Sequence, residues 1–251
     1  MSATLVISSR NYSSWSLRGW LLTRLSGLPF EVELVDDARS RAELLMRSSS
    51  MRVPCLIHDG LSVWDTLAIA EYLNELRPEA GMLPTERVAR ARCRSIAGEI
   101  HSGFSALRSA LPMNLRARKH NFAVWSGARA DIDAVMEIWR GCLSTWQGPF
   151  LFGDRVTIAD AMYAPVVTRF QTYEVAMDGD CAAYAARIMA LPDMMEWVGL
   201  AVGEADEVPE LEMEFCQRGF VMDRRRGRGI RRRGSGSAIF GSHGRAETAG
   251  L

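Results

Sequence analysis

The pattern of apolar residues changes abruptly near residue 82, and this change predicts a chain of two dissimilar domains. Before it, short β-branched or alternating segments are interleaved with segments that have helical spacing. Residues 77–84 (RPEAGMLP) then interrupt the pattern with two prolines and a glycine, as a linker does. After this interruption, strand-like alternation disappears and long segments with helical spacing follow. We therefore predict an α/β N-terminal domain and an all-helical C-terminal domain.

The order of elements in the first 80 residues predicts the kind of sheet. A β-α-β unit is followed by a hairpin, with Asp59 and Gly60 at its turn, and then by a helix. With a further helix after the second strand, the order is β-α-β-α-β-β-α, an α/β sheet with one antiparallel edge. The predicted strands cover residues 4–8, 30–35, 54–58 and 61–64, and the predicted helices cover 15–25 and 66–76. In the second domain, we predict helices over residues 86–111, 128–146, 158–173, 180–190 and 192–202.

The formal net charge of zero conceals two segments of opposite charge. Residues 217–251 contain nine arginines but two acidic residues, and residues 1–216 carry seven more acidic than basic side chains. Because residues 217–251 are rich in Arg, Gly and Ser and have little to bury, we predict a disordered tail there. The acidic part repels phosphate backbones, so we expect no nucleic-acid binding except through the tail.

The cysteines and the apolar runs indicate the compartment. The five cysteines are widely scattered and have few histidines near them, which predicts reduced thiols and no metal site. No apolar run approaches the ~20 residues that span a bilayer, and the first residues lack the pattern of a signal peptide. We therefore expect a cytoplasmic protein that does not bind membranes.

Three segments of the N-terminal domain carry residues that could bind a ligand. At residues 11–18 (NYSSWSLR), hydroxyl side chains lie at a predicted strand-to-helix turn. The helix dipole favours an anion there and lowers the pKa of a bound thiol. Alternatively, one of the serines only caps the helix. At Val53-Pro54, a cis peptide bond would expose the backbone of Val53 to a ligand, whereas a trans bond would simply begin a strand. Asp65 and Thr66 could cap the helix that follows them, or bind the amino and carboxylate ends of an amino-acid-like ligand. In a β-α-β-β-α domain, the three segments meet at one edge.

Taken in this order, the segments resemble the cytosolic glutathione S-transferases. The matching motifs are VPCL at 53–56, DTLAI at 65–69 and the helix-capping sequence TIAD at 157–160. The serine segment SSWSLR at 13–18 is similar to the loop of the serine-type zeta, theta and tau classes, and most of all to the zeta pattern S-S-x-S-x-R. The resemblance extends from about residue 5 to residue 215 and suggests a bacterial member of the family.

The resemblance implies a domain organisation and a set of site residues. The implied parts are a thioredoxin-like glutathione-binding domain at 1–80, a linker at 81–86, an all-helical domain at 87–216 and the basic tail at 217–251. Ser13, with Ser14 as the second candidate, would donate a hydrogen bond to the glutathione sulfur and favour the thiolate. The implied glutathione-binding residues are Arg18, Arg39 (or Arg41), Val53, a cis Pro54, Asp65 and Thr66, and the implied electrophile site contains His101 and Phe104. Two departures from the family pattern are Thr66, where serine is usual, and residues 48–52 (SSSMR), where relatives have a Pro-Gly turn.

The implied activity is that of a glutathione transferase. It would activate the glutathione thiolate, without a metal, for the conjugation or isomerisation of small hydrophobic electrophiles, as detoxification enzymes do. One alternative is a non-catalytic glutathione-binding or regulatory protein of the same fold. Another is an isomerase of a maleyl-type diacid, in which Arg18 would bind a carboxylate. The resemblance also implies a homodimer.

Overall fold

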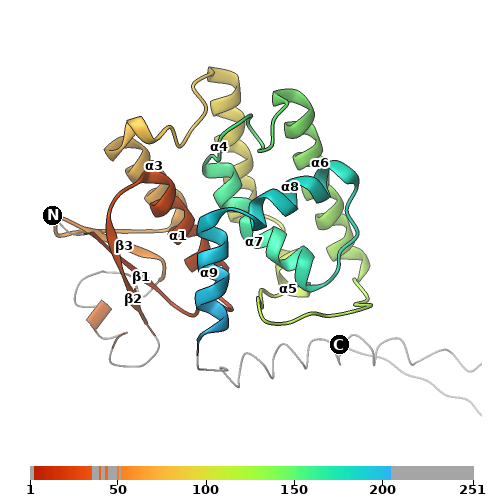
Figure 1. The fold of residues 1–251 in the computed structure, drawn as a ribbon, viewed down its shortest axis with the longest axis horizontal. Helices are drawn as coiled ribbons and strands as arrows, with labels where there is room; N and C mark the ends of the chain where they lie inside the picture. The colour runs from red at the N-terminus through yellow and green to blue at the C-terminus, as the bar shows by residue number, and fades with distance from the viewer. Residues whose placement is uncertain (1–2, 36–39, 41–42, 45–49, 51, 205–251) are drawn as a thin grey trace, which may run out of the picture. The chain divides into compact units, whose positions relative to one another are not determined.

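The computed structural model describes residues 3–35, 40, 43–44, 50 and 52–204, which form a sheet domain followed by a helical domain (Figure 1). The predicted tail lies outside the described residues, as do Arg39, Arg41 and most of the predicted helix after the second strand. In the part of the chain that the structure describes, every helix is too short or too polar to cross a membrane.

The sheet has four strands, and its order is β2-β1-β3-β4. The strands are β1 (Ala3–Ile7), β2 (Phe30–Leu34), β3 (Cys55–His58) and β4 (Leu61–Trp64). β1 runs parallel to β2 and antiparallel to β3, so that Leu5 stands opposite both Val32 and Leu56. β3 and β4 form a hairpin whose turn residues, Asp59 and Gly60, both have a positive φ, as the primed hairpin turns require. The structure confirms the predicted α/β sheet with its antiparallel edge.

Two helices of the sheet domain pack against each other on one face of the sheet (Figure 1). Helix α1 (Ser14–Ser26) connects the parallel strands β1 and β2, and helix α3 (Thr66–Leu76) follows β4. A close contact joins α1 to the start of β3, because a Cβ atom added at Gly19 would lie only 2.5 Å from the Cβ atom of Pro54. Glycine is therefore needed at this position of α1, and the helix lies directly against the segment that begins β3.

The helical domain is built around the buried helix α7 (Ile158–Thr172), which contacts α1 and two helices of its own domain, α4 and α8. The other helices are α4 (Arg87–Ser102), α5 (Ser105–Ala110), α6 (Ser126–Trp146), α8 (Gly179–Met189) and α9 (Pro192–Val202), and the short 3-10 helix η1 (Pro78–Ala80) precedes them. The predicted capping box begins α7: the backbone N–H of Thr157 donates to Asp160 over 2.8 Å, and the Thr157 side chain completes the box. The structure confirms the all-helical second domain.

The prediction of one helix over residues 86–111 is wrong, because the structure has a break between α4 and α5. The backbone N–H of Gly103 bonds to the carbonyl of Glu99 over 2.8 Å and closes α4. Phe104 then adopts a left-handed conformation, with a φ of 55°, which no helix interior contains. The apolar spacing continues across this break, since Leu107 of α5 is also buried, so periodicity alone does not reveal it.

Candidate functional site

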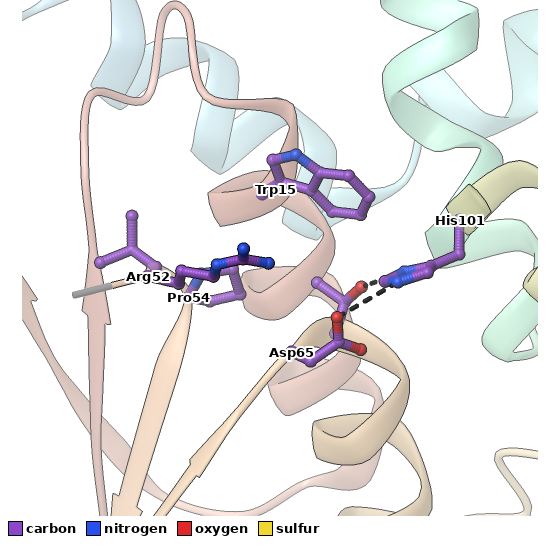
Figure 2. A pocket seen from close by; sticks show the side chains of 7 residues that line it. Trp15, Arg52, Pro54, Asp65 and His101 are labelled. Carbon is purple, nitrogen blue, oxygen red and sulfur yellow. Dashed lines mark hydrogen bonds and ion pairs between the residues drawn. The ribbon is translucent and has the colours of Figure 1, made fainter. Parts of the chain in front are cut away.

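A cavity of about 350 Å³ lies where the sheet domain meets helix α4. Figure 2 shows the side chains around it: Trp15 comes from the first turn of α1, Pro54 precedes β3, Asp65 precedes α3, and His101 comes from the last turn of α4. The cavity is lined by Trp15, Arg52, Val53, Pro54, Asp65, Thr66 and His101. Two of the three segments that the sequence singled out therefore reach this cavity through the predicted residues, and the third reaches it through Trp15.

The serine segment caps helix α1. Ser13 is the N-cap residue, and its hydroxyl oxygen accepts a hydrogen bond from the backbone N–H of Ser16 over 3.2 Å. The Ser13 hydroxyl also donates to the Ser16 hydroxyl oxygen over 2.8 Å, and that oxygen accepts from the backbone N–H of Ser8 over 3.1 Å. Ser14 is the first residue of the helix and is buried. Neither Ser13 nor Ser14 is among the described residues that line the cavity, whereas the next residue, Trp15, is.

The segment before β3 presents its backbone to the cavity. The peptide bond between Val53 and Pro54 is cis, and both residues line the cavity. Arg52 adds an exposed guanidinium group to the same wall. The next residue, Cys55, lies inside β3 with no exposed surface, so its thiol belongs to the core of the sheet domain.

The start of α3 is held by a histidine from the helical domain. Asp65 caps α3 by accepting a hydrogen bond from the backbone N–H of Leu67 over 2.9 Å, and it has a positive φ of 76°. Its other carboxylate oxygen lies 3.1 Å from Nε2 of His101, while Nδ1 of His101 lies 3.3 Å from the Thr66 hydroxyl (Figure 2). His101 also meets the ring of Trp15 edge-on, with centroids 5.1 Å apart. The structure thus places His101 against Asp65 and Thr66.

Two arginines, the buried Arg18 and the half-buried Arg108, lie against the ring of Trp15. The guanidinium carbons of Arg18 and Arg108 lie 4.6 Å and 4.4 Å from the centroid of the Trp15 ring. Burial, followed by repulsion from Arg169 and Arg108, lowers the pKa of Arg18 well below its usual value. Burial also lowers the pKa of Arg108, and it lowers that of Arg169 to about 10.

The three arginines have few polar partners. Arg18 donates from Nε to the carbonyl of Met162 over 2.8 Å, but its Nη1 atom is buried and has no hydrogen-bond partner within the described part of the chain. Arg108 and Arg169 donate to backbone carbonyls. Among the described residues, no carboxylate forms an ion pair with any of the three. Because buried charges in proteins are normally paired, this cluster is suited to receive an anionic group.

Two further predicted residues, Arg18 and Phe104, are not among the described residues that line the cavity, and Arg39 and Arg41 lie outside the described part of the chain. Arg18 lies behind Trp15, and Phe104 lies at the start of α5. Sequence reasoning missed Trp15, Arg52 and Arg108. Trp15 lies inside the serine segment itself, so its position next to Ser14 was a usable signal, whereas nothing in the sequence around Arg108 marks it. Within the described residues, no group of three or more His, Cys, Asp or Glu side chains could hold a metal ion.

Comparison with known families gives two matches that together cover most of the chain. The family model described as the N-terminal domain of glutathione S-transferase matches residues 12–76, and the model described as the C-terminal domain of glutathione S-transferase matches residues 87–199.

Individual proteins agree with these matches. The chain is 29% identical over 171 residues to maleylacetoacetate isomerase of Rattus norvegicus, covering 66% of this chain and 77% of the relative. It is 27% identical over 160 residues to a probable maleylacetoacetate isomerase of Caenorhabditis elegans, covering 63% and 74%. Among solved structures, a glutathione transferase homolog from Burkholderia with bound glutathione has a TM-score of 0.63 at 24% identity, covering 82% of this chain and all of that one. The structural likeness shows the same fold.

Proposed function

Because the chain belongs to the glutathione S-transferase family, we propose that its cavity binds glutathione and that the first turn of α1 stabilises the bound thiolate. The chain is a glutathione transferase, and glutathione is its co-substrate. The observation that carries the assignment of the site is the convergence of the α1 N-terminus, the cis Val53-Pro54 bond and the Asp65–Thr66 pair on one cavity. These groups match the three parts of a tripeptide thiol.

Each part of glutathione has a partner in this proposal. The backbone of Val53 pairs with the cysteinyl residue, because a cis peptide bond leaves its N–H and carbonyl accessible beside Pro54. Asp65 and Thr66 hold the ammonium and carboxylate groups of the γ-glutamyl end. Arg52, which lines the cavity, supplies a positive charge for the glycyl carboxylate. The electrophile binds beside the sulfur, on the side of Trp15.

Ser13 can serve both the helix and the thiolate. Its oxygen lone pair accepts the N–H of Ser16, and this cap remains if the hydroxyl hydrogen turns from the Ser16 oxygen toward a sulfur. The turn gives up a hydrogen bond between neutral groups, with a net value of about 0.5–1.5 kcal/mol, for one to a charged group, worth about 1.5–3 kcal/mol. The exchange favours the thiolate, and the dipole of α1 acts in the same direction.

The test is the pKa of the glutathione thiol bound to Ser13 and Ser14 variants, measured from the ultraviolet absorbance of the thiolate. We expect S13A to raise this pKa by about one to two units, since a hydrogen bond to the charged sulfur is lost, and S14A to leave it unchanged. S13A also removes the helix cap, which costs about 1 kcal/mol of stability, so S13T serves as the control that keeps both cap and donor. A shift in S14A but not in S13A would move the catalytic role to Ser14.

A second candidate function, isomerisation of a maleyl-type diacid, is favoured by the arginines that lie against Trp15. Arg108 and Arg18 place two positive charges beside Trp15, and no described residue accepts a hydrogen bond from the Nη1 atom of Arg18. A carboxylate of the second substrate would supply the missing negative charge, and the curated relatives named above are maleylacetoacetate isomerases.

Arg108 separates this candidate from conjugation of neutral electrophiles. We expect R108Q to raise the KM for a maleyl-type diacid about tenfold or more, because a charge-assisted hydrogen bond is lost, while the KM for a chlorinated nitrobenzene stays the same. R129Q, at an exposed position of α6, is the matched control. An equal rise in KM for both substrates would argue against a carboxylate subsite.

We further propose that the protein acts as a cytoplasmic homodimer. Support for a dimer comes from large apolar side chains that β4 and α4 expose, namely Leu61, Trp64 and Val88. Light scattering should give about twice the 27.9 kDa of one chain. A mass of one chain at micromolar concentration would contradict this proposal.

A further inference from the structure

The loop that leads into Ser13 is held from outside the sheet domain by one carboxylate. Glu204, which follows α9, accepts hydrogen bonds from the backbone N–H of Arg10 over 2.8 Å and that of Asn11 over 3.3 Å. It also accepts from the Ser9 hydroxyl over 3.0 Å, and it forms an ion pair with Arg10. The side chains of Glu204 and Arg10 are only 16% and 14% exposed, so this set of bonds is largely shielded from solvent.

Ser9 connects Glu204 by hydrogen bonds to Ser13, the residue that we propose as the partner of the thiol. Because the Ser9 hydroxyl hydrogen points to Glu204, its oxygen is left to accept the backbone N–H groups of Asn11, over 3.2 Å, and Tyr12, over 3.3 Å. The carbonyl of Ser9 accepts the backbone N–H of Ser13 over 3.0 Å. Each backbone N–H from residue 10 to residue 13, the whole approach to the helix cap, is therefore bonded either to Glu204 or to Ser9.

Further hydrogen bonds hold both Glu204 and the loop before Ser13 against the helical domain. Arg116 donates to the backbone carbonyl of Glu204 over 3.1 Å, and the indole N–H of Trp197 in α9 donates to the carbonyl of Arg10 over 3.1 Å. The side-chain oxygen of Asn11 accepts the backbone N–H of Leu115 over 2.8 Å. The loop before Ser13 is thus bonded to the helical domain at both its backbone and its side chains.

From this network we infer that Glu204 is a positioning residue that sets the orientation of Ser13 toward the glutathione sulfur. The inference rests on the proposed function. Glu204 does not line the cavity among the described residues, so it acts through the loop and touches neither substrate. Its effect should appear in the ionisation of the bound thiol, while the contacts of Val53, Asp65 and Thr66 with glutathione remain.

The sign of the pKa change distinguishes positioning from a simple effect of charge. The substitution E204Q removes a negative charge, and this change alone would make a nearby thiolate more favourable and lower the thiol pKa. Loss of positioning acts in the opposite direction, because the amide nitrogen that replaces one carboxylate oxygen cannot accept the hydrogen bonds made to that oxygen, and Ser13 is released from its orientation. If Glu204 positions Ser13, the pKa of the bound thiol rises in E204Q.

The experiment compares full-length wild type, E204Q, E204D, S9A and the double variant E204Q/S9A in the pH profile of kcat/KM for conjugation of a chlorinated nitrobenzene. We expect E204Q to raise the kinetic pKa by about one unit, equivalent to a tenfold lower thiolate fraction below that pKa, with an unchanged KM for glutathione. E204D should raise the kinetic pKa less than E204Q does. The double variant should raise the kinetic pKa no more than S9A alone, because the two residues act in one chain of hydrogen bonds. E196Q, at an exposed carboxylate of α9, the helix that precedes Glu204, is the matched control.

The outcomes separate this inference from the proposed function. A wild-type protein that does not lower the pKa of bound glutathione contradicts the proposed function itself. A wild type that does so, together with an E204Q variant whose kinetic pKa is unchanged or lower, overturns the positioning role of Glu204 alone. A lower melting temperature in E204Q without a change in the pH profile would likewise reduce Glu204 to a purely structural contact.

Discussion

At the scale of single residues, the sulfur chemistry proposed here has to come from the bound co-substrate, because the protein's own described thiols are shielded. Cys55, Cys93, Cys142 and Cys181 are all buried, and no disulfide joins any of them to another described residue. Burial raises the pKa of Cys93 to about 12 and that of Cys142 to about 11. A thiol with such a pKa is almost entirely protonated at neutral pH, and only the thiolate is a nucleophile.

These pKa shifts predict how the cysteines respond to alkylation. In the native protein at pH 7, we expect iodoacetamide to leave the four described cysteines essentially unmodified, and peptide mass spectrometry should show full labelling only after unfolding in guanidinium. Raising the pH to 9 should change little, because burial keeps the pKa of Cys93 and Cys142 well above that pH. Rapid labelling of Cys55 that glutathione prevents would instead place a reactive thiol at the site.

Residue types and order were enough to predict part of the site. Val53, Pro54, Asp65 and Thr66 lie in recognisable motifs, and the structure gathers all four at one cavity. The contact of His101 with Asp65 could not be predicted, because it joins α4 to the sheet domain across 36 residues of chain. The role of each residue in binding remains a prediction.

At the scale of elements, helix α7 links the folding of the helical domain to the site. The carboxylate of Asp160 at its start accepts hydrogen bonds from the backbone and hydroxyl of Thr157, each over 2.8 Å, from the N–H of Leu151 over 3.1 Å, and from the Tyr184 hydroxyl over 3.2 Å. Two residues after Asp160, the backbone carbonyl of Met162 accepts a hydrogen bond from Nε of Arg18. A disturbed start of α7 should therefore reach the arginine cluster.

The substitution D160A tests how much this capping site contributes to the stability of the protein. It leaves several buried donors without an acceptor, at about 1–3 kcal/mol for each, so we expect the free energy of unfolding to fall by roughly 3 kcal/mol or more. D180A, at an exposed position in the first turn of α8, should change it by less than about 0.5 kcal/mol. Urea denaturation followed by tryptophan fluorescence measures both, and equal effects of the two substitutions would contradict the buried network.

Element types were more predictable from the sequence than their ends. Period-two alternation and the Asp59-Gly60 turn predicted the hairpin, and the TIAD sequence at 157–160 predicted the start of α7. The break between α4 and α5 was missed because the same apolar spacing continues on both sides of Phe104. The extended backbone of Gly103 and the left-handed backbone of Phe104 separate the two helices, and helical periodicity carries no information about single dihedral angles.

At the scale of the whole molecule, the sequence divides charge between two parts whose roles we expect to be separate. The change of pattern near residue 82 predicted the two domains that the structure has, and both of them contribute to the cavity. The arginine-rich segment at 217–251 begins after the matched family domains end. Its charge cancels that of the rest of the chain, so the net charge of zero says nothing about the field at the site.

Removal of residues 217–251 tests this separation of roles. The truncated chain keeps Glu204 and all described residues of the site, so we expect kcat/KM for glutathione conjugation to stay within about twofold of the full-length value, a difference of about 0.4 kcal/mol. Because nine arginines are lost, the truncated chain should leave a heparin column at a lower salt concentration than the full chain. A full chain in which the nine arginines are replaced by glutamine is the control, since it changes charge without changing length. A large loss of kcat/KM in the truncated chain but not in the glutamine variant would show that the segment supports the enzyme by something other than its charge.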